Sequence, residues 1–441
     1  MKINTAVRRD PVFTHEGARA VHLNPEQQLR RSVMACLLWE DTFYEDGKSI
    51  AQRIADGVKA VKPESVAKMA VEARVKMKLR HVPLLLVREM ARLPKHKALV
   101  SSTLESVIQR PDELTEFLAI YWKDKKQPLS KQVKRGLAKA FTKFNEYALA
   151  KYNRDGAIKL RDVLFLSHAK PKDEEQAALW KRLVDGKLAT PDTWEVSLSG
   201  GKDKKDTFER LMAEKQLGAL AFIRNLRNMH DAGVRKGTVS EYAAGLNIER
   251  VLPFRFITAA RMVPQWEDLL EPLMMKALAG QPKLLGRTVL LMDVSGSMDA
   301  KLSSKSDTTR MDAGFGLGVL LREICEDCDI LTFSEQVVRV AARHGFALRD
   351  AMKNSQPHGG TYLQQAVELV NAKLQYDRLI VITDEQAHDG PGNPNGLGYV
   401  INVATNRNGV GYGQWVHIDG WSEAVIDYLR ALEGNDVSAE A

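Results

Sequence analysis

The sequence has few of the features that would place it in a secreted or membrane class. It has only three cysteines, Cys36, Cys325 and Cys328, too few for the disulfide framework of a small secreted domain. Its most apolar run, Val82–Val87, is far too short to span a bilayer, and the first residues lack the apolar stretch of a secretion signal. We therefore expect a cytoplasmic protein that does not enter membranes.

The net charge of +8 is divided unevenly along the 441 residues. Residues 1–285 hold 51 Lys and Arg against 35 Asp and Glu, a net charge of +16, whereas residues 286–441 hold 13 against 21, a net charge of −8. Such an asymmetry suggests that one part attracts a polyanion. Because the chain is too long for one hydrophobic core, we expect two domains, 1–285 and 286–441.

From about Asn24 to Gly280, apolar residues recur at helical spacing. No segment there alternates over a useful length in the way of a half-buried strand. Pro63 and Pro111 each predict the start of a helix. Successive helices with short connections are typical of antiparallel pairs stacked as HEAT-like repeats. We therefore predict an all-helical first domain.

After Leu285, short apolar runs rich in β-formers alternate with helical patterns. Strands are expected over Thr288–Met292, Asp329–Phe333, Val337–Ala341, Arg378–Thr383, Tyr399–Val403 and Trp415–Ile418, and helices over Met311–Ile324, Tyr362–Ala372 and Ser422–Glu433. This order predicts a three-layer α/β domain with a mostly parallel sheet. A ligand would bind beyond the carboxyl ends of the strands.

Oxygen-bearing side chains follow the strands of this second domain. We expect one metal site, with ligands on three loops: Asp293, Ser295, Ser297, Thr361 and Asp384. Hydroxyls and water-mediated carboxylates suit Mg²⁺, which binds six oxygens and keeps several waters. Neutral hydroxyls also leave the ion able to accept a carboxylate or phosphate oxygen from a partner. The sequence therefore predicts Mg²⁺ or another divalent cation, the alternative being that the serines are turn residues and Asp384 a strand-end cap.

No catalytic residue is predicted. Metal-assisted hydrolysis would need a poised general base beside the ion, and only Glu385 and His388 stand near the motif. We interpret both as loop residues that face solvent, and we expect that the protein is not an enzyme.

The segment Lys123–Lys143 contains eight basic residues and a single acid. Lys131, Arg135, Lys139 and Lys143 recur every four residues, which predicts one basic stripe on a helix whose other side is apolar. A solvated helix face would explain a single run of this kind. A second basic stretch, Arg74–Lys97, lies in the same region of net charge +16. We therefore expect the stripe to contact nucleic acid.

Two sets of motifs resemble known families. DVSGS at 293–297, GGT at 359–361 and ITDE at 382–385 resemble the metal-ion-dependent adhesion site of von Willebrand factor A-like domains, over about residues 286–436. Four further segments resemble, in order, the motifs of the TROVE module: Lys159–Pro171, Thr193–Glu195, Leu220–Met229 and Val251–Ala260. The combination resembles the Ro autoantigen family.

This resemblance implies a ring of HEAT-like repeats closed by the von Willebrand A-like domain. Family members bind small noncoding Y RNAs on the outer basic surface, and single-stranded 3′ ends of misfolded or structured RNAs enter a central hole. In bacteria, Ro proteins are associated with Y-like RNAs and with the exoribonuclease polynucleotide phosphorylase, in RNA quality control and decay. The family's Y RNA contacts correspond here to Lys151, Arg154 and His168. We therefore expect a monomeric, non-catalytic RNA-binding scaffold.

Two other functions remain open on the sequence. In the first, the chain is a Mg²⁺-dependent protein-interaction module whose metal site captures an acidic residue of a partner. In the second, which we rank last, it is a Mg²⁺-dependent nuclease. For His168 alone, a partly buried structural histidine is the alternative to an RNA contact.

Overall fold

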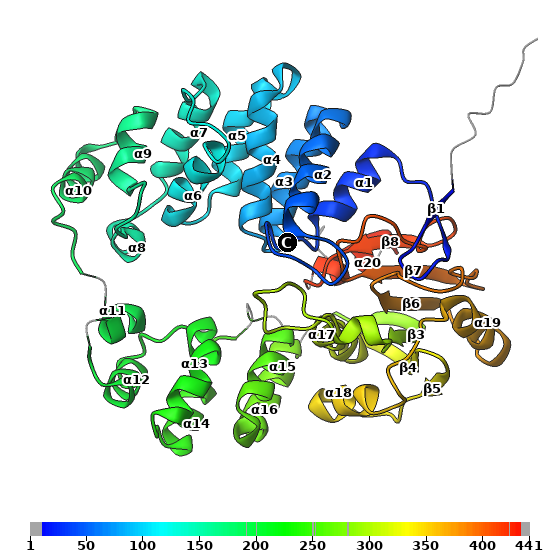
Figure 1. Ribbon diagram of the computed structural model, residues 1–441. Helices are drawn as coiled ribbons and strands as arrows, with labels where there is room; N and C mark the ends of the chain where they lie inside the picture. Colours follow the sequence, from blue (N-terminus) through cyan, green and yellow to red (C-terminus); the bar gives the residue numbers. More distant parts are fainter. Residues whose placement is uncertain are drawn as a thin grey trace, which may run out of the picture.

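The computed structural model describes residues 11–190, 192–199, 201–248, 251, 253–279, 282–422 and 424–433. The chain leaves the sheet domain along an upper arm of helices, turns at the far end and returns along a lower arm, so that it closes on itself (Figure 1). The upper arm contains α1 (Pro25–Val33), α2 (Gly47–Ala60), α3 (Pro63–Val75), α4 (His81–Arg92), α5 (Lys97–Val107), α6 (Pro111–Tyr121), α7 (Lys131–Phe141), α8 (Glu146–Tyr152), α9 (Leu160–Ser167) and α10 (Glu174–Val184). The lower arm contains α11 (Trp194–Ser199), α12 (Lys204–Ala213), α13 (Ala219–Asp231), α14 (Lys236–Ala244), α15 (Pro253–Met262) and α16 (Glu267–Leu278).

Helix α7 shows how individual residues determine where a helix of the upper arm begins and how closely it packs on its neighbour. The hydroxyl of Ser130 accepts a hydrogen bond from the backbone N–H of Val133 at 3.3 Å and begins the helix. Gly136 faces α5 so closely that a Cβ there would lie 2.9 Å from the carbonyl oxygen of Ser101. Only a glycine lets the two helices approach to this distance. The opposite side of α7 therefore faces solvent.

The second domain is a six-stranded sheet in the order β5-β4-β3-β6-β7-β8. Every neighbouring pair is parallel except β4 and β5, which confirms the predicted mostly parallel sheet. Its strands are β3 (Leu284–Asp293), β4 (Cys325–Phe333), β5 (Val337–Arg339), β6 (Arg378–Thr383), β7 (Leu397–Asn402) and β8 (Val416–Asp419). Its helices are α17 (Arg310–Ile324), α18 (Gly345–Lys353), α19 (Leu363–Lys373) and α20 (Ala424–Leu432).

Both faces of the sheet are buried, as expected for parallel strands covered by helices. Along β3, Leu290 and Met292 join the apolar core that contains α17 and α20, whereas Val289 and Leu291 join the core under α19. The first of these cores also includes apolar residues of α12–α16. The lower arm and the sheet are therefore packed around one continuous core.

Two elements were not expected from the sequence. Helix α18 buries only Phe346, Leu348 and Met352 beside its first glycine, a spacing too irregular to predict a helix. A hairpin of β1 (Val12–Phe13) and β2 (Arg19–Ala20) precedes the first helix. It is held by long-range contacts, because the hydroxyl of Thr14 donates to the carbonyl of Ala387 at 2.9 Å.

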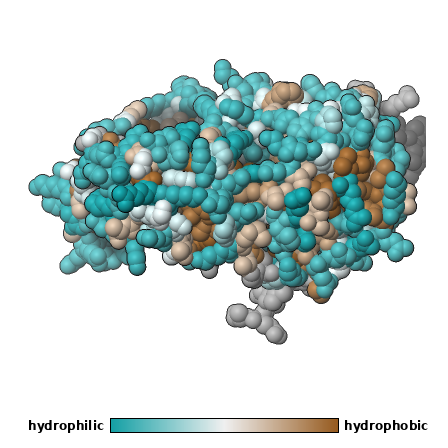
Figure 2. Space-filling view, turned by 90° about the horizontal axis from the view of Figure 1, so that it is seen from below, coloured by the Kyte–Doolittle hydropathy of each residue, from teal (hydrophilic) through white to brown (hydrophobic). Residues whose placement is uncertain are grey.

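The lower face of the molecule is mainly hydrophilic, and apolar side chains gather toward the end that holds the sheet domain (Figure 2). Among the helices that the structure describes, none combines the length and apolar composition of a membrane span.

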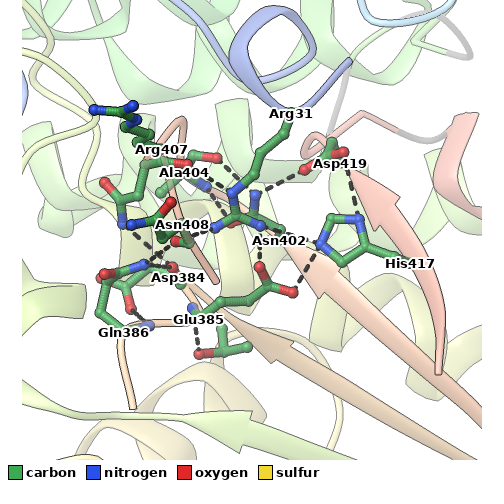
Figure 3. A network of polar contacts seen from close by, with 12 residues as sticks. Arg31, Asp384, Glu385, Gln386, Asn402, Ala404, Arg407, Asn408, His417 and Asp419 are labelled. Atoms are coloured by element: carbon green, nitrogen blue, oxygen red, sulfur yellow. Dashed lines mark hydrogen bonds and ion pairs between the residues drawn. The ribbon is translucent and has the colours of Figure 1, made fainter. Parts of the chain in front are cut away.

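The ring closes where α1 meets the loops at the carboxyl edge of the sheet. Arg31 is fully buried there and forms an ion pair with Glu385, which is also fully buried (Figure 3). Its remaining N–H groups donate to the carbonyls of Asn406 at 2.6 Å and Asn408 at 3.0 Å. A Cβ on Gly409 would collide with both partners of the ion pair. The backbone at Gly409 thus packs directly against the guanidinium of Arg31 and the carboxylate of Glu385.

A histidine completes this network. His417 Nε2 lies 2.7 Å from Glu385 Oε1, and its Nδ1 lies 3.4 Å from Asp419 Oδ2. Burial lowers the pKa of His417, but Asp419 and Glu385 outweigh burial and raise it to about 9. Two cations therefore face two carboxylates inside the closure.

We predict that Arg31→Met destabilises the protein by about 3–5 kcal/mol, because it leaves a buried carboxylate without its main partner. Urea unfolding followed by circular dichroism would measure the loss. Arg30→Met is the control, since Arg30 pairs with Glu72 at a partly exposed site and should cost about 1 kcal/mol or less. Equal losses in the two variants would contradict a special role for Arg31.

Candidate metal centre and nucleic-acid interface

The predicted metal ligands lie on three loops that hydrogen bonds join at the carboxyl edge of the sheet. Asp293 ends β3, where its Oδ1 accepts from the N–H of Ser295 at 2.8 Å and its Oδ2 from the hydroxyl of Thr383 at 2.6 Å. The hydroxyls of Ser295 and Ser297 are 3.4 Å apart. The N–H of Gly296 donates to Gly359 at 3.0 Å, which ties this loop to the one before Thr361.

The electrostatics of the site fit a cation. Burial raises the pKa of Asp293 to about 7, and the neighbouring carboxylate of Asp384 adds to the rise. Asp384 pairs with Arg310, whose Nη1 lies 2.6 Å from its Oδ2. Asp384 is thus paired with a guanidinium, whereas Asp293 has no cationic partner among the described residues and lies beside several hydroxyls. A hard divalent cation would supply the missing charge.

The shell would depend on hydroxyls. Within the described part of the chain, no three His, Cys, Asp or Glu side chains gather as metal ligands. Thr361 is buried, and its N–H donates to Nδ1 of His388 at 3.1 Å. Asp293, Ser295 and Asp384 are buried as well, whereas Ser297 is partly exposed.

The prediction that Glu385 faces solvent is wrong. Its side chain is fully buried against Arg31, because the backbone turns at this residue with a φ of 59° and sends the carboxylate into the ring closure. His388 is exposed, as predicted, and its Nε2 lies 3.2 Å from a carboxylate oxygen of Glu16. Both groups are therefore engaged in structure.

The sequence reasoning also missed Arg310. It is the first residue of α17, where the helix dipole disfavours a cation. A cation at this unfavourable position is the one signal in the sequence that Arg310 pairs with a nearby anion.

On the upper arm, the basic stripe is shorter than predicted. Lys131, Arg135 and Lys139 are exposed on α7, and Lys139 pairs with Glu105 at 3.2 Å. Lys143 does not continue the stripe, because α7 ends at Phe141. Its ammonium donates instead to the carbonyl of Ile108 at 3.0 Å, and burial lowers its pKa.

The packing of α7 against α9 adds a histidine to this surface. His168 ends α9 in the left-handed conformation, with a φ of 55°, and its Nε2 lies 3.3 Å from the ammonium of Lys134. Lys151 lies in the last turn of α8 and Arg154 just beyond it. Among the described residues, no hydrogen bond or ion pair joins these two to α7 or His168.

Two neighbours of His168 and Lys131 were not singled out on the sequence. Lys134 lies one turn from Lys131 and reaches His168. Phe165, three residues before His168 on α9, is 60% exposed. An exposed aromatic ring on a helix that packs against a cationic helix could stack a base of single-stranded RNA. Its exposure could not be recognised in the sequence, because apolar residues stand on either side of it and suggest a buried position.

Known proteins resemble this chain in sequence and in fold. Residues 171–311 match the TROVE domain. The matched segment contains three of the four motifs noted in the sequence, at 193–195, 220–229 and 251–260. Among curated proteins, none matches the chain in sequence.

The crystal structure of the Ro (RSR) protein of Deinococcus radiodurans superposes with a TM-score of 0.60. It covers 93% of this chain and 100% of that chain, at 20% sequence identity. The helical arms and the sheet domain therefore share the fold of a Ro protein. Residues 171–311 thus match a TROVE domain, and the chain as a whole has the fold of a Ro protein.

Proposed function

We propose that the chain is a non-catalytic scaffold for RNA quality control or decay, acting as a monomer in the cytoplasm. Its outer basic surface would bind a small noncoding Y-like RNA. Single-stranded 3′ ends of misfolded RNA would enter a central hole between the arms. An exoribonuclease such as polynucleotide phosphorylase is the proposed protein partner.

The observation that carries this proposal is the cluster of exposed cations on α7, with His168 beside it. Lys131 and Arg135 are exposed and form no ion pair among the described residues. Helices α7 and α9, which carry these residues, lie farther from the lower arm than α6 and α8 do, on the outer side of the ring (Figure 1). Cations held on a packed helix contact phosphates without first having to be ordered.

We predict that the double variant Lys131→Glu, Arg135→Glu weakens the binding of structured RNA regardless of its sequence. Two lost phosphate contacts should lower the slope of log affinity against log salt by about 1.4, at about 0.7 per contact for single strands. Fluorescence anisotropy over a range of salt concentrations would measure both effects.

The matched control is Lys202→Glu, Lys204→Glu, which changes the net charge equally at the exposed start of α12. If both double variants weaken binding alike, the effect belongs to overall charge, and α7 is not the binding surface.

A second prediction concerns Phe165. Phe165→Ala should weaken the binding of RNA with a single-stranded segment by about 1–3 kcal/mol if one base stacks on the ring. Leu285→Ala, an equally exposed apolar truncation on β3, should have no effect. Anisotropy with the same labelled RNA gives the comparison, and identical affinity of Phe165→Ala and the parent would exclude stacking at this position.

We also propose that Asp293, Ser295, Ser297, Thr361 and Asp384 hold Mg²⁺ or another divalent cation. The uncompensated buried carboxylate and the nearby hydroxyls support this assignment. Bound there, the cation would supply positive charge at the carboxyl edge of the sheet.

Asp293→Ala should abolish Mg²⁺ binding in isothermal titration calorimetry and leave RNA affinity unchanged, since α7 lies on a different part of the ring. Asp299→Ala is the control, because Asp299 is on the same loop but exposed. Persistent Mg²⁺ binding by Asp293→Ala would contradict the site. Loss of a protein partner with RNA affinity intact would favour the alternative function, a metal-dependent protein-interaction module.

A further inference from the structure

The loop between α1 and α2 crosses from the upper arm to the metal site. The N–H of Ser304, in the sheet domain, donates to the carbonyl of Asp41 at 2.8 Å, and the hydroxyl of Ser303 donates to Glu40. The loop is also braced from within, because the N–H of Gly47 donates to a carboxylate oxygen of Asp41 at 2.8 Å. It is therefore a fixed connection between the two domains.

Tyr44 is the residue of this loop that reaches the proposed metal ligands. The guanidinium carbon of Arg310 lies 5.0 Å from the centroid of its ring, and that guanidinium bonds Asp384 at 2.6 Å. On another side, the ring of His15 lies 4.3 Å from that of Tyr44. The phenol is thus held between the amino-terminal hairpin and the side chain that neutralises Asp384.

The hydroxyl of Tyr44 has no satisfactory partner within the described ranges. Its oxygen is buried and makes no hydrogen bond. Burial raises the pKa of Tyr44 to about 12, and Asp384 contributes to the rise. Ser297 is near enough to act on this pKa, yet the two hydroxyls form no well-aligned bond. A protonated donor left without an acceptor in a buried place is unfavourable, and it lies beside two proposed ligands of the cation.

We propose that Tyr44 is a positioning residue of the metal centre, whose hydroxyl donates a hydrogen bond to a water molecule on the cation. The inference rests on the proposed metal site. The cation then fastens the α1–α2 loop, and with it the upper arm, to the sheet domain. The chain itself covers the centre, in keeping with the burial of Asp293, Ser295, Thr361 and Asp384. We call this link between the α1–α2 loop and the sheet domain, made through the proposed metal site, the clasp.

Tyr44→Phe tests this directly, since it removes one oxygen and keeps the ring. Loss of a partner in the outer shell of a metal typically weakens its binding by 10- to 100-fold, so we expect Mg²⁺ to bind at least about tenfold more weakly in isothermal titration calorimetry. Tyr147→Phe, the same change at an exposed residue of α8, should bind Mg²⁺ as the parent does.

A second measurement uses the unaltered protein. Because a cation that binds only when the loop is closed lowers the population of its open states, Mg²⁺ should slow amide hydrogen exchange at residues 39–45 in the parent chain and not in Asp293→Ala. No change at these amides in the parent on adding Mg²⁺ would overturn the clasp, whatever the folding of the variants.

The outcomes separate the two proposals. A parent chain that binds no Mg²⁺ overturns the metal site and the clasp together. A parent that binds Mg²⁺, with Tyr44→Phe binding equally well, overturns only the role of Tyr44.

Discussion

The buried ion pair of Arg31 and Glu385 is the constraint on which the rest of the structure depends. A guanidinium can be removed from water only if its charge and its N–H groups are all satisfied. Here a carboxylate and two backbone carbonyls do so, all on loops more than 350 residues away in the sequence. The first helix can therefore be buried in this way only when the last strands are folded, and the ring closes as a result.

The ring closure and the proposed metal site share a loop. Asp384 and Glu385 are neighbours after the end of β6, and the backbone directs the first side chain to Arg310 and the second to Arg31. Arg310 and Arg31 consequently neutralise adjacent carboxylates from opposite domains of the chain.

The basic surface follows from the same closed architecture. Because Gly136 has no side chain, α7 packs closely against α5, and the polar side of α7 points away from the arm. The packing of α9 then carries His168 to Lys134. Cations from separate helices are thereby presented on one outer face, while the acidic sheet domain lies at the other end of the molecule (Figure 1).

Much of this could be predicted from the sequence, where the signals are local. The strands were found because apolar β-formers are bounded by turn residues. The metal site rests on the same strand ends, since Asp293, Thr361 and Asp384 follow strands or precede a helix in a parallel sheet, and it stays a prediction. Arg31 and Tyr44 could not be found, since their partners are far away in the chain and nothing local marks them for burial. For Arg310 the one local signal is its unfavourable place at the start of α17. Lys143 was misplaced because α7 ends two residues before it.

The central claim is that this ring binds RNA through α7 and α9. Ultraviolet crosslinking in cells, followed by mass spectrometry of the crosslinked peptides and sequencing of the recovered RNA, tests it most directly. We expect peptides from residues 131–168 joined to a small noncoding RNA. Crosslinks confined to the acidic sheet domain, or no recovered RNA, would contradict the account.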